Sequence, residues 1–261
     1  MTRIDCRDIS GGDAAIAEHA RPAYESILKD GYAVLDNIVP ATRMATLHEE
    51  FNSRYDRYLR DVEHEDSQQV GNRRYRVPIE FSGGFADPSI YANPAVLAVV
   101  RQALGPDAII EAYGAVVSLA GAEAQHTHRD GPFLFEAAIS PILPCHALTF
   151  AMPLVGMDAT QGTTGFWPGS HRWKTLPEGP PPETPAIAAG SCLLWDFRLI
   201  HAGTENRTGR HRPMMYVTYA RSWYRDPTAF TRAAQVRLAF GDGFLENLPA
   251  DRRVLFNHLP G

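Results

Sequence analysis

The stretch GSCLLWDFRLIHAG, residues 190–203, has the composition of a buried β-strand. Successive side chains of a regular strand point to opposite faces. One face would then carry Leu193, Trp195, Phe197, Leu199 and His201. Because all but the last are apolar, we expect this face to lie against a core. A histidine at the end of such a face is buried, so its ring must be hydrogen-bonded or must bind a metal ion.

Other segments of the second half have the same composition. They are rich in β-branched and aromatic residues and are separated by Gly, Pro and Asn turns, which is typical of short strands in a barrel or sandwich. These segments are AIIEAYGAVVSLAG at 108–121, HALTFAMPLVGM at 146–157 and HRPMMYVTYARSWY at 211–224. The proline-rich 176–186 is expected to be a surface loop, because proline cannot donate to a strand ladder.

The first part of the chain has mainly helical spacing instead. Helices are predicted over 13–30, ending at Gly31, over 41–61, and over 94–104 with Asn93 as N-cap. YAVLDNIVP at 32–40 is predicted to be a short strand. We expect one domain, 1–261, with a mainly helical part at about 1–105, a strand-rich core at about 106–225 and a C-terminal extension at 226–261.

Composition and charge narrow the function classes. The chain has 261 residues and a net charge of -5, with a pI near 6.0. This charge disfavours a nucleic-acid or anionic-membrane partner and favours a small molecule. Cys6, Cys145 and Cys192 have no metal-type spacing, which suits a reducing compartment. With no signal-peptide pattern and no long apolar run, the protein is expected to be cytoplasmic.

AEAQHTHRDGP at 122–132 supplies a second group of metal-ligand residues. On an extended strand His126, His128 and Asp130 would project from one face. His-x-Asp followed about 70 residues later by a histidine on another strand, here His201, is the spacing of a two-histidine, one-carboxylate triad. Such a triad leaves coordination positions open and suits non-haem Fe(II).

Three motifs resemble those of the phytanoyl-CoA dioxygenase family of Fe(II) and 2-oxoglutarate dependent oxygenases. They are QHTHRDGPFLF at 125–135, TTGFWPGSHRW at 163–173 and HAGTENRTGRHRP at 201–213, in this order and spacing. DGYAVLDNIVP at 30–40 is similar to the N-terminal strand of that family. The resemblance implies a mainly β fold with flanking helices: a double-stranded β-helix, which is a jelly roll related to cupins.

The resemblance also assigns roles to residues. It makes His128, Asp130 and His201 the metal ligands and catalytic centre, and it leaves His126 as a group that faces the substrate or supports the ligands. Residues similar to Gln125 and Thr164 lie near the cosubstrate in the family. The founding members have a lysine where this chain has Ser118, and commonly Asn-Gly where it has Gln161-Gly162.

An arginine is expected to bind the far carboxylate of 2-oxoglutarate, because guanidinium can pair with carboxylate in bidentate fashion. Arg207 and Arg210 flank a Thr-Gly turn and are predicted to be near solvent. Arg212 lies further into the next strand and shares a face with Met214, Tyr216 and Thr218 if that strand is regular. The resemblance points to the same residue, since the family places its cosubstrate arginine eleven residues after the last histidine.

The implied activity is that of a 2-oxoglutarate-dependent non-haem iron dioxygenase. Such an enzyme uses Fe(II), 2-oxoglutarate and O2, with ascorbate as reductant in vitro, and releases succinate and CO2. Hydroxylation of a small organic substrate is the expected outcome, while desaturation, epimerisation and cyclisation begin in the same way.

The segment RRYRVPIEFSGGFADPSIYANP at 73–94 resembles an arm that closes over the active site in natural-product members of the family. Apolar and aromatic residues in it are predicted to form the substrate walls. These are Tyr75, Ile79, Phe81 and Phe85. A natural-product intermediate is therefore the expected substrate. The alternatives are an acyl-CoA substrate, for which Arg73, Arg74 and Arg76 form the one dense basic cluster, and a non-catalytic or zinc-bound cupin-like binding protein.

Overall fold

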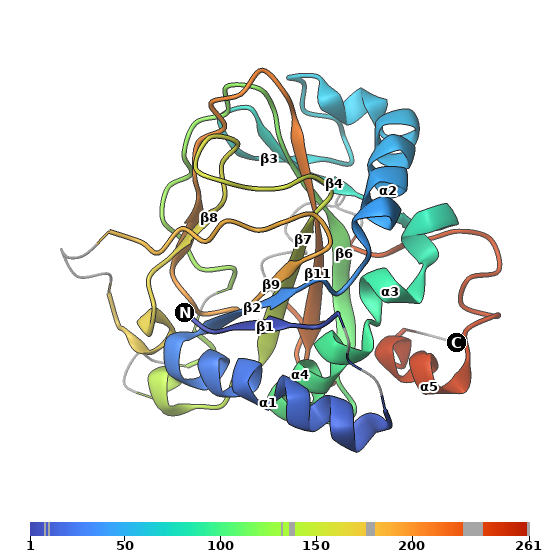
Figure 1. The fold of residues 1–261 in the computed structure, drawn as a ribbon, viewed down its shortest axis with the longest axis vertical. Coiled ribbons are helices and arrows are strands. Elements are labelled where there is room, and N and C mark those ends of the chain that lie inside the picture. Colours follow the sequence, from blue (N-terminus) through green and yellow to red (C-terminus); the bar gives the residue numbers. More distant parts are fainter. Residues whose placement is uncertain are drawn as a thin grey trace.

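An eight-stranded sheet forms the centre of the computed structural model (Figure 1). The structure describes residues 1–7, 9, 11–131, 133–135, 139–175, 181–226 and 237–259. Neighbouring strands are antiparallel except for the parallel pair β1 and β2. In spatial order the strands are β1 (Arg3–Asp5), β2 (Tyr32–Asp36), β9 (Cys192–Asp196), β7 (Ala147–Pro153), β11 (Arg212–Ala220), β6 (Ile109–Ser118), β4 (Arg74–Pro78) and β3 (Gln68–Gly71).

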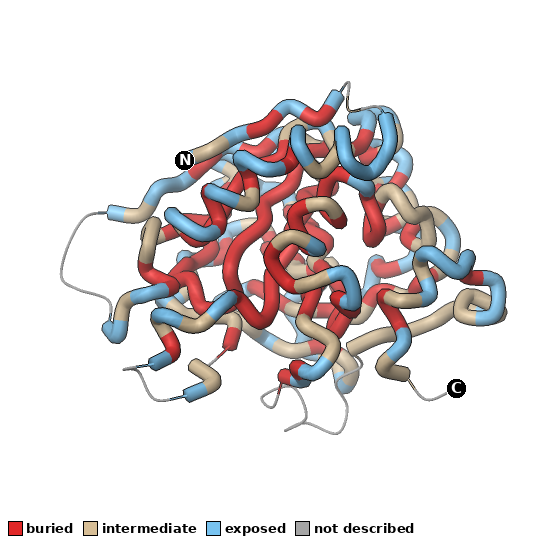
Figure 2. Tube along the Cα trace, turned by 90° about the horizontal axis from the view of Figure 1, so that it is seen from below, coloured by how far each residue is buried: buried red, intermediate tan, exposed pale blue. Residues whose placement is uncertain are grey.

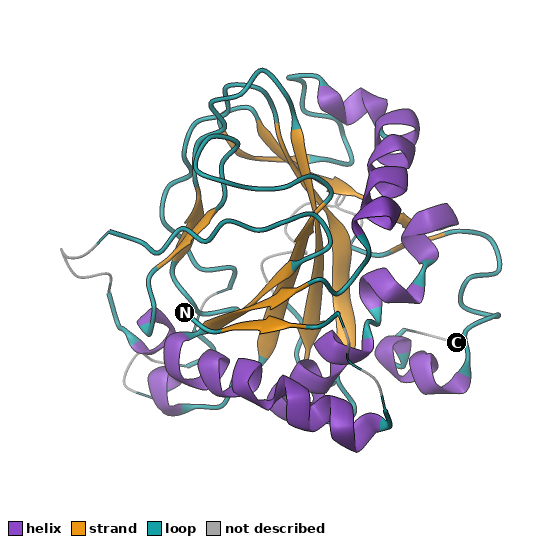
Figure 3. Cartoon of the chain, in the orientation of Figure 1, coloured by secondary structure: helices purple, strands orange, loops and turns teal. Residues whose placement is uncertain are grey.

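A smaller antiparallel sheet packs against the large one (Figure 3). It consists of β8 (Thr164–Phe166) and β10 (His201–Gly203). Phe166 stacks on Tyr32 of β2 with ring centroids 4.4 Å apart, and Trp195 of β9 lies 5.5 Å from Phe166. Two packed antiparallel layers are the arrangement that a jelly roll requires.

Helices cover the face of the large sheet that is turned away from β8 and β10 (Figures 1 and 2). The main apolar core lies between these helices and the sheet, and Figure 2 shows the buried residues concentrated there. The helices are α1 (Asp13–Asp30), α2 (Ala41–Arg54), α3 (Pro88–Tyr91), α4 (Pro94–Leu104) and α5 (Ala250–Arg253). The short 3-10 turns are η1 (Asp56–Leu59), η2 (Gly83–Ala86), η3 (Ser140–Ile142), η4 (Ser170–Arg172) and η6 (Val254–Phe256).

The predicted ends of two helices are confirmed. Helix α1 ends at Gly31, which has φ 89° and donates its backbone N–H to the carbonyls of Ser26 and Ile27. At the start of α4, Asn93 Oδ1 accepts from the backbone N–H of Ala95 at 3.0 Å.

The stretch 190–203 is not one regular strand, and the predicted alternation is wrong at Phe197, whereas Leu199 packs with Leu193 and Trp195 as predicted. Strand β9 ends at Asp196, the chain turns, and β10 begins at His201. The Asp196 carboxylate closes the turn by accepting from the backbone N–H and from Nε of Arg198, both at 2.9 Å. The break moves the chain from the large sheet to the small one, and Phe197 packs beside Tyr224 instead of Leu193.

The first 105 residues are less purely helical than expected. β1 to β4 all come from this part of the chain and join the same sheet as the later strands. In the C-terminal extension, β12 (Ala239–Phe240) pairs in parallel with β5 (Glu80–Phe81). Residues 176–180 of the proline-rich loop 176–186 lie outside the described residues.

No helix in the described part of the chain has the length and apolar character needed to cross a membrane.

Candidate metal and cosubstrate site

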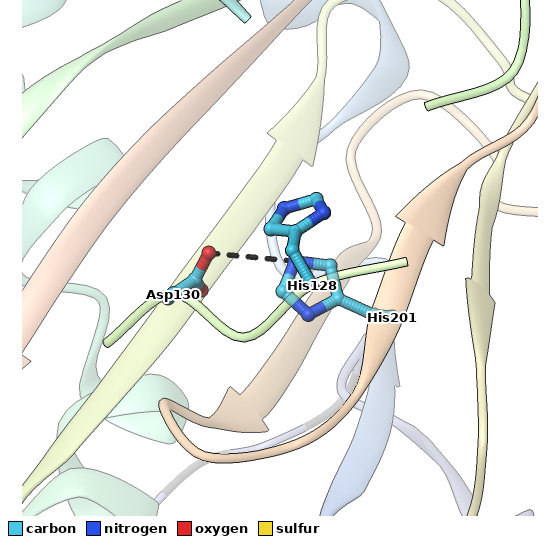
Figure 4. A group of neighbouring side chains, drawn as sticks. All are labelled: His128, Asp130 and His201. Carbon is cyan, nitrogen blue, oxygen red and sulfur yellow. Dashed lines mark ion pairs between the residues drawn. The ribbon is translucent and has the colours of Figure 1, made fainter. Parts of the chain in front are cut away.

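The predicted metal ligands lie together (Figure 4). One ligand atom from each of His128, Asp130 and His201 lies within 4.8 Å of the others. His128 and His201 are direct backbone partners in an isolated antiparallel bridge, with N–H to O=C distances of 3.0 and 2.9 Å. Residues 126–130 do not form the regular strand that the sequence predicts. His126 is exposed and lies at the rim of the cavity into which the triad opens. The backbone pairing therefore fixes the spacing of the two imidazoles.

Backbone carbonyls orient both imidazoles. Nδ1 of His128 lies 3.0 Å from the carbonyl oxygen of His126, and Nδ1 of His201 lies 2.9 Å from that of Leu199. If each Nδ1 carries the proton for its hydrogen bond, each Nε2 has a free lone pair. Nε2 of His201 faces Oδ1 of Asp130 at 3.4 Å, the contact drawn in Figure 4. The rings therefore present Nε2 to the point where a metal ion would bind.

The two carboxylate oxygens of Asp130 have different partners. Oδ2 accepts from Thr149 Oγ1 at 2.5 Å and from Trp195 Nε1 at 2.8 Å, whereas Oδ1 is directed at His201. Burial raises the pKa of Asp130, but the two histidines and the hydroxyl of Thr149 outweigh this and keep the pKa below its usual range. Asp130 is therefore an anion whose Oδ1 can bind a cation. Two imidazoles and one carboxylate fit Fe(II).

The triad opens into a cavity of about 490 Å³. Its walls come from β8 and β10 of the small sheet and from β3, β4, β6, β7, β9 and β11, so the large sheet forms most of the lining. The lining includes the triad, Gln68, Gln69, Val70, Arg74, Arg76, Val116, Gln125, His126, Thr149, Thr164, Trp195, Gly203, Arg212, Met214, Tyr216, Thr218, Asp226 and Arg237. A volume of this size is in the range of small-molecule sites.

The predicted face of β11 is confirmed, because Arg212, Met214, Tyr216 and Thr218 all line the cavity. The side chain of Arg212 is 1% exposed, and its Nη1 contacts Met157 Sδ at 2.7 Å. Arg212 forms no ion pair with any residue that the structure describes. Burial, and then the charge of Arg74, lower the pKa of Arg212 to about 9. An anion in the cavity would reverse this penalty.

The two other candidate arginines lie away from the cavity. Arg207 is exposed and forms an ion pair with Glu205, and Arg210 is exposed beside the turn. Neither has a side chain in the cavity wall. The expectation that solvent surrounds both residues is therefore confirmed.

Gln125 and Thr164 both line the cavity, but Gln125 is occupied by backbone groups. Its Nε2 donates to the carbonyl of Val70 at 2.7 Å, and its Oε1 accepts from the N–H of Gly203 at 3.0 Å. Gln125 thus connects β3 to β10. Thr164 is the first residue of β8 and is the backbone partner of Gly203.

The predicted substrate walls require a correction. Tyr75, Ile79, Phe81 and Phe85 are at most 4% exposed, belong to the main core and do not line the cavity. On β4 the side chains alternate, so Arg74 and Arg76 face the cavity while Tyr75 points into the main apolar core on the other face of the sheet.

Aromatic neighbours explain where two of these side chains lie. Phe81 stacks on Tyr113 with ring centroids 4.1 Å apart and packs against Phe244 of the C-terminal extension at 4.8 Å. Phe85 lies edge-on to Tyr55 at 5.6 Å. These rings hold helices and the extension to the sheet.

Sequence reasoning missed three side chains of the site. Thr149 and Trp195 hold Asp130, and Arg74 lies in the cavity wall. Trp195 stood on the same predicted face as His201, which was the only available signal. The sequence places Arg74 in one basic cluster with Arg73 and Arg76, and alternation of neighbouring side chains was the signal that could have separated Arg74 from Arg73.

Comparison with known proteins identifies the family. The model of the family "Phytanoyl-CoA dioxygenase (PhyH)" matches residues 27–214. The dioxygenase FUM3 of Gibberella moniliformis is 30% identical over 122 residues, which are 45% of this chain. The matched segment spans only 41% of that relative's length.

Solved structures share the fold. The non-haem α-ketoglutarate dependent epimerase SnoN from nogalamycin biosynthesis is 20% identical, with a TM-score of 0.60 over 82% of this chain and 88% of SnoN. HygX from Streptomyces hygroscopicus, solved with nickel and 2-oxoglutarate, is 16% identical, with a TM-score of 0.60 over 79% of this chain and 89% of HygX. The predicted double-stranded β-helix is confirmed. The family match covers most of the chain, which therefore belongs to the phytanoyl-CoA dioxygenase family of Fe(II) and 2-oxoglutarate dependent oxygenases.

Proposed function

We propose that the protein is a 2-oxoglutarate-dependent non-haem iron dioxygenase that oxidises a small organic molecule. The observation that carries this proposal is the presence, in one cavity, of a two-histidine, one-carboxylate triad and a buried arginine without an ion-pair partner among the described residues. A binding protein would not need both features.

His128, Asp130 and His201 would hold Fe(II), which when bound supplies the activation of O2 coupled to decarboxylation of 2-oxoglutarate. The chain contributes position and charge. Thr149 and Trp195 keep Oδ2 of Asp130 occupied, so that Oδ1 is the oxygen offered to the metal. Three protein ligands leave the other coordination positions for cosubstrate and O2.

Arg212 would bind the far carboxylate of 2-oxoglutarate. It shares the cavity with the triad, and its depressed pKa indicates a cation that lacks a counter-ion. Removal of one partner of such a buried pair costs on the order of 3 to 5 kcal/mol. Arg212→Ala should therefore weaken 2-oxoglutarate binding by at least about a hundredfold, whereas Arg207→Ala, at the exposed turn, should leave it unchanged.

We infer that the substrate is a natural-product intermediate or a similar small molecule with polar groups. SnoN is an epimerase of nogalamycin biosynthesis, and HygX has also been solved with hygromycin B bound. Away from the triad, the cavity wall carries Gln68, Gln69 and Tyr216. These side chains, with His126 at the rim, replace the aromatic wall first expected from 73–94.

An acyl-CoA substrate is less well supported, because the arginines of 73–76 do not form one surface cluster. Arg73 is exposed beside Asp61 at 3.7 Å, Arg74 is buried, and Arg76 faces the cavity. A CoA diphosphate would require these charges to be side by side at the surface.

The activity is tested with purified protein, Fe(II), 2-oxoglutarate and ascorbate, by measuring O2 consumption and succinate. Slow substrate-independent succinate formation is expected, and His128→Ala should abolish it. Wild-type protein with confirmed iron that forms no more succinate than His128→Ala would indicate the binding-protein alternative. Candidate substrates are then screened for faster succinate formation, and mass spectrometry of the product separates hydroxylation from desaturation, epimerisation or cyclisation.

A further inference from the structure

Two arginines and a serine lie in one row across the large sheet. Strand β6 runs between β4 and β11, and Ser118 is the backbone partner of both Arg74 and Arg212. Residues in such register point to the same face, and Arg74 and Arg212 of this row line the cavity. The exposed fractions are 1% for Arg74, 0% for Ser118 and 1% for Arg212. Two cations are therefore buried on either side of one hydroxyl.

The row contains three buried polar atoms without a hydrogen bond: Nε of Arg74, Oγ of Ser118 and Nε of Arg212. Most buried polar atoms in proteins have a partner. The buried Arg198 is paired with Asp196, and the partly buried Arg237 is paired with Glu111. Within the described ranges neither Arg74 nor Arg212 forms an ion pair. The row thus has the donors for an anion that the chain itself does not supply.

Backbone contacts fix Arg74 at the cavity wall. Its Nη2 donates to the carbonyl of Thr204 at 2.8 Å and to that of Glu123 at 3.2 Å. Its Nη1 lies over Gly203, where an added Cβ would be 2.1 Å away. Neutral carbonyls orient the guanidinium but do not neutralise its charge. Burial lowers the pKa of Arg74 to about 10, and the charge of Arg74 contributes to the low pKa of Arg212.

We propose that Arg74 is a second cation for the far carboxylate of 2-oxoglutarate, which it binds together with Arg212 and Ser118. This inference rests on the proposed function. A carboxylate has about four lone-pair sites, enough to accept from two guanidinium groups and a hydroxyl at once. Arg74 enters from β4 and Arg212 from β11, so the carboxylate would bridge two strands that are not neighbours.

The test measures binding by titration calorimetry of the Ni(II)-loaded protein without O2. One ligand is 2-oxoglutarate, and the other is 2-oxopentanoate, which has a methyl group in place of the far carboxylate. Arg74→Met should weaken 2-oxoglutarate binding at least about tenfold, equivalent to about 1.4 kcal/mol. The same change should alter 2-oxopentanoate binding less than about twofold. A purely structural arginine would affect both ligands alike.

Matched variants separate the outcomes. Arg76→Met removes the next cation on the same face of β4, beside Val116 instead of Ser118, and should not change the preference for 2-oxoglutarate. Arg212→Met should reduce that preference as Arg74→Met does. If Arg74→Met does not fold, Ser118→Ala removes one donor of the row and should reduce the preference by a smaller factor.

The inference would be overturned, with the proposed function left in place, if Arg74→Met lost equal affinity for the two ligands. Unchanged 2-oxoglutarate binding in Arg74→Met, or in Ser118→Ala where it replaces Arg74→Met, would have the same meaning. Failure of the wild type to bind 2-oxoglutarate would instead remove the proposed function.

Discussion

At the scale of single residues, the two carboxylate oxygens of Asp130 have separate roles in the site. Oδ2 is held by Thr149 and Trp195, and Oδ1 faces His201. Hydrogen bonds to the non-coordinating parts of a ligand commonly tune metal affinity by 10- to 100-fold. The supporting side chains should therefore matter although they do not touch the metal.

Thr149→Val removes one of these hydrogen bonds at nearly constant volume. We expect the affinity for Fe(II) or Ni(II) to fall by roughly 10-fold or more, because Asp130 loses a partner that orients it. Metal titration measures the change. Thr218→Val is the control, since Thr218 lines the same cavity, whereas Thr149 and Trp195 are the side chains that donate to Oδ2 of Asp130. Equal metal affinities in the two variants would contradict this role.

The candidate metal ligands could be predicted from sequence, but their supports could not. Spacing alone selects a group that includes His126, and the resemblance to the family narrows it to His128, Asp130 and His201. Arg212 follows from strand alternation together with the same resemblance. Thr149 reaches Asp130 from another strand, β7, through sheet pairing that no local pattern encodes. Contacts between segments distant in sequence depend on the register of the whole sheet.

At the scale of elements, the turn between β9 and β10 sets the place of His201. The backbone N–H of Asp196 donates to the carbonyl of Gly31 at 2.8 Å, so the end of α1 supports this turn. Sequence alternation predicted a continuous strand here, because a single buried Asp–Arg pair within an apolar run is not distinguishable from an outward-facing pair. The structure shows both side chains buried.

Gly31→Ala tests this support. Gly31 has φ 89°, and an added Cβ would lie 2.5 Å from Leu199 Cδ1 and 2.7 Å from His171 Nδ1. We expect the free energy of unfolding to fall by at least about 1 to 3 kcal/mol, as measured by urea denaturation. Gly209→Ala is the control, because nothing lies within 4 Å of its added Cβ. If the two variants are equally stable, the strain argument fails.

The Asp196–Arg198 pair should make stability depend on pH. Burial raises the pKa of Asp196, but the hydrogen bond and charge of Arg198 outweigh it and hold the pKa below its usual value. A carboxyl group with a lowered pKa in the folded state stabilises the fold above its unfolded pKa, and this contribution is lost as pH falls through the folded pKa. Wild-type stability should therefore decline below about pH 4.

Asp196→Asn should lower the free energy of unfolding at pH 7 by about 3 to 5 kcal/mol, since it leaves Arg198 buried without a charge partner. It should also flatten the acid side of the stability curve. Denaturation between pH 3 and 7 measures both effects. Glu205→Gln, in an exposed pair, should behave like the wild type. If the free energy of unfolding of Asp196→Asn falls with decreasing pH as steeply as that of the wild type, other carboxylates cause the pH dependence.

At the scale of the whole molecule, most of the fold is independent of the metal. The main core lies on the helix side of the large sheet, and the triad lies on the other side, toward β8 and β10. Strand composition predicts a barrel or sandwich, and only through the resemblance of the motifs to the family could the jelly roll be predicted. The location of segment 73–94 could not, because the packing of Phe81 on the C-terminal extension joins parts far apart in sequence.

Metal removal should therefore leave the protein folded. We expect EDTA-treated protein to keep its circular dichroism spectrum and cooperative melting. Metal with 2-oxoglutarate at a hundred times its Kd should add about 2.7 kcal/mol, which raises Tm by several degrees for a chain of this size. Unfolding of the metal-free protein, or a Tm that does not respond to 2-oxoglutarate when metal is present, would contradict this view.

The backbone bridge between His128 and His201 has a consequence for protein engineering. Both imidazoles are spaced by one pair of main-chain hydrogen bonds, whereas Gln68, Gln69 and Arg76 stand on β3 and β4 at the far edge of the large sheet. Libraries that randomise these edge positions should alter substrate choice and leave iron loading intact. The scaffold thereby separates the part that can be diversified from the part that must be preserved.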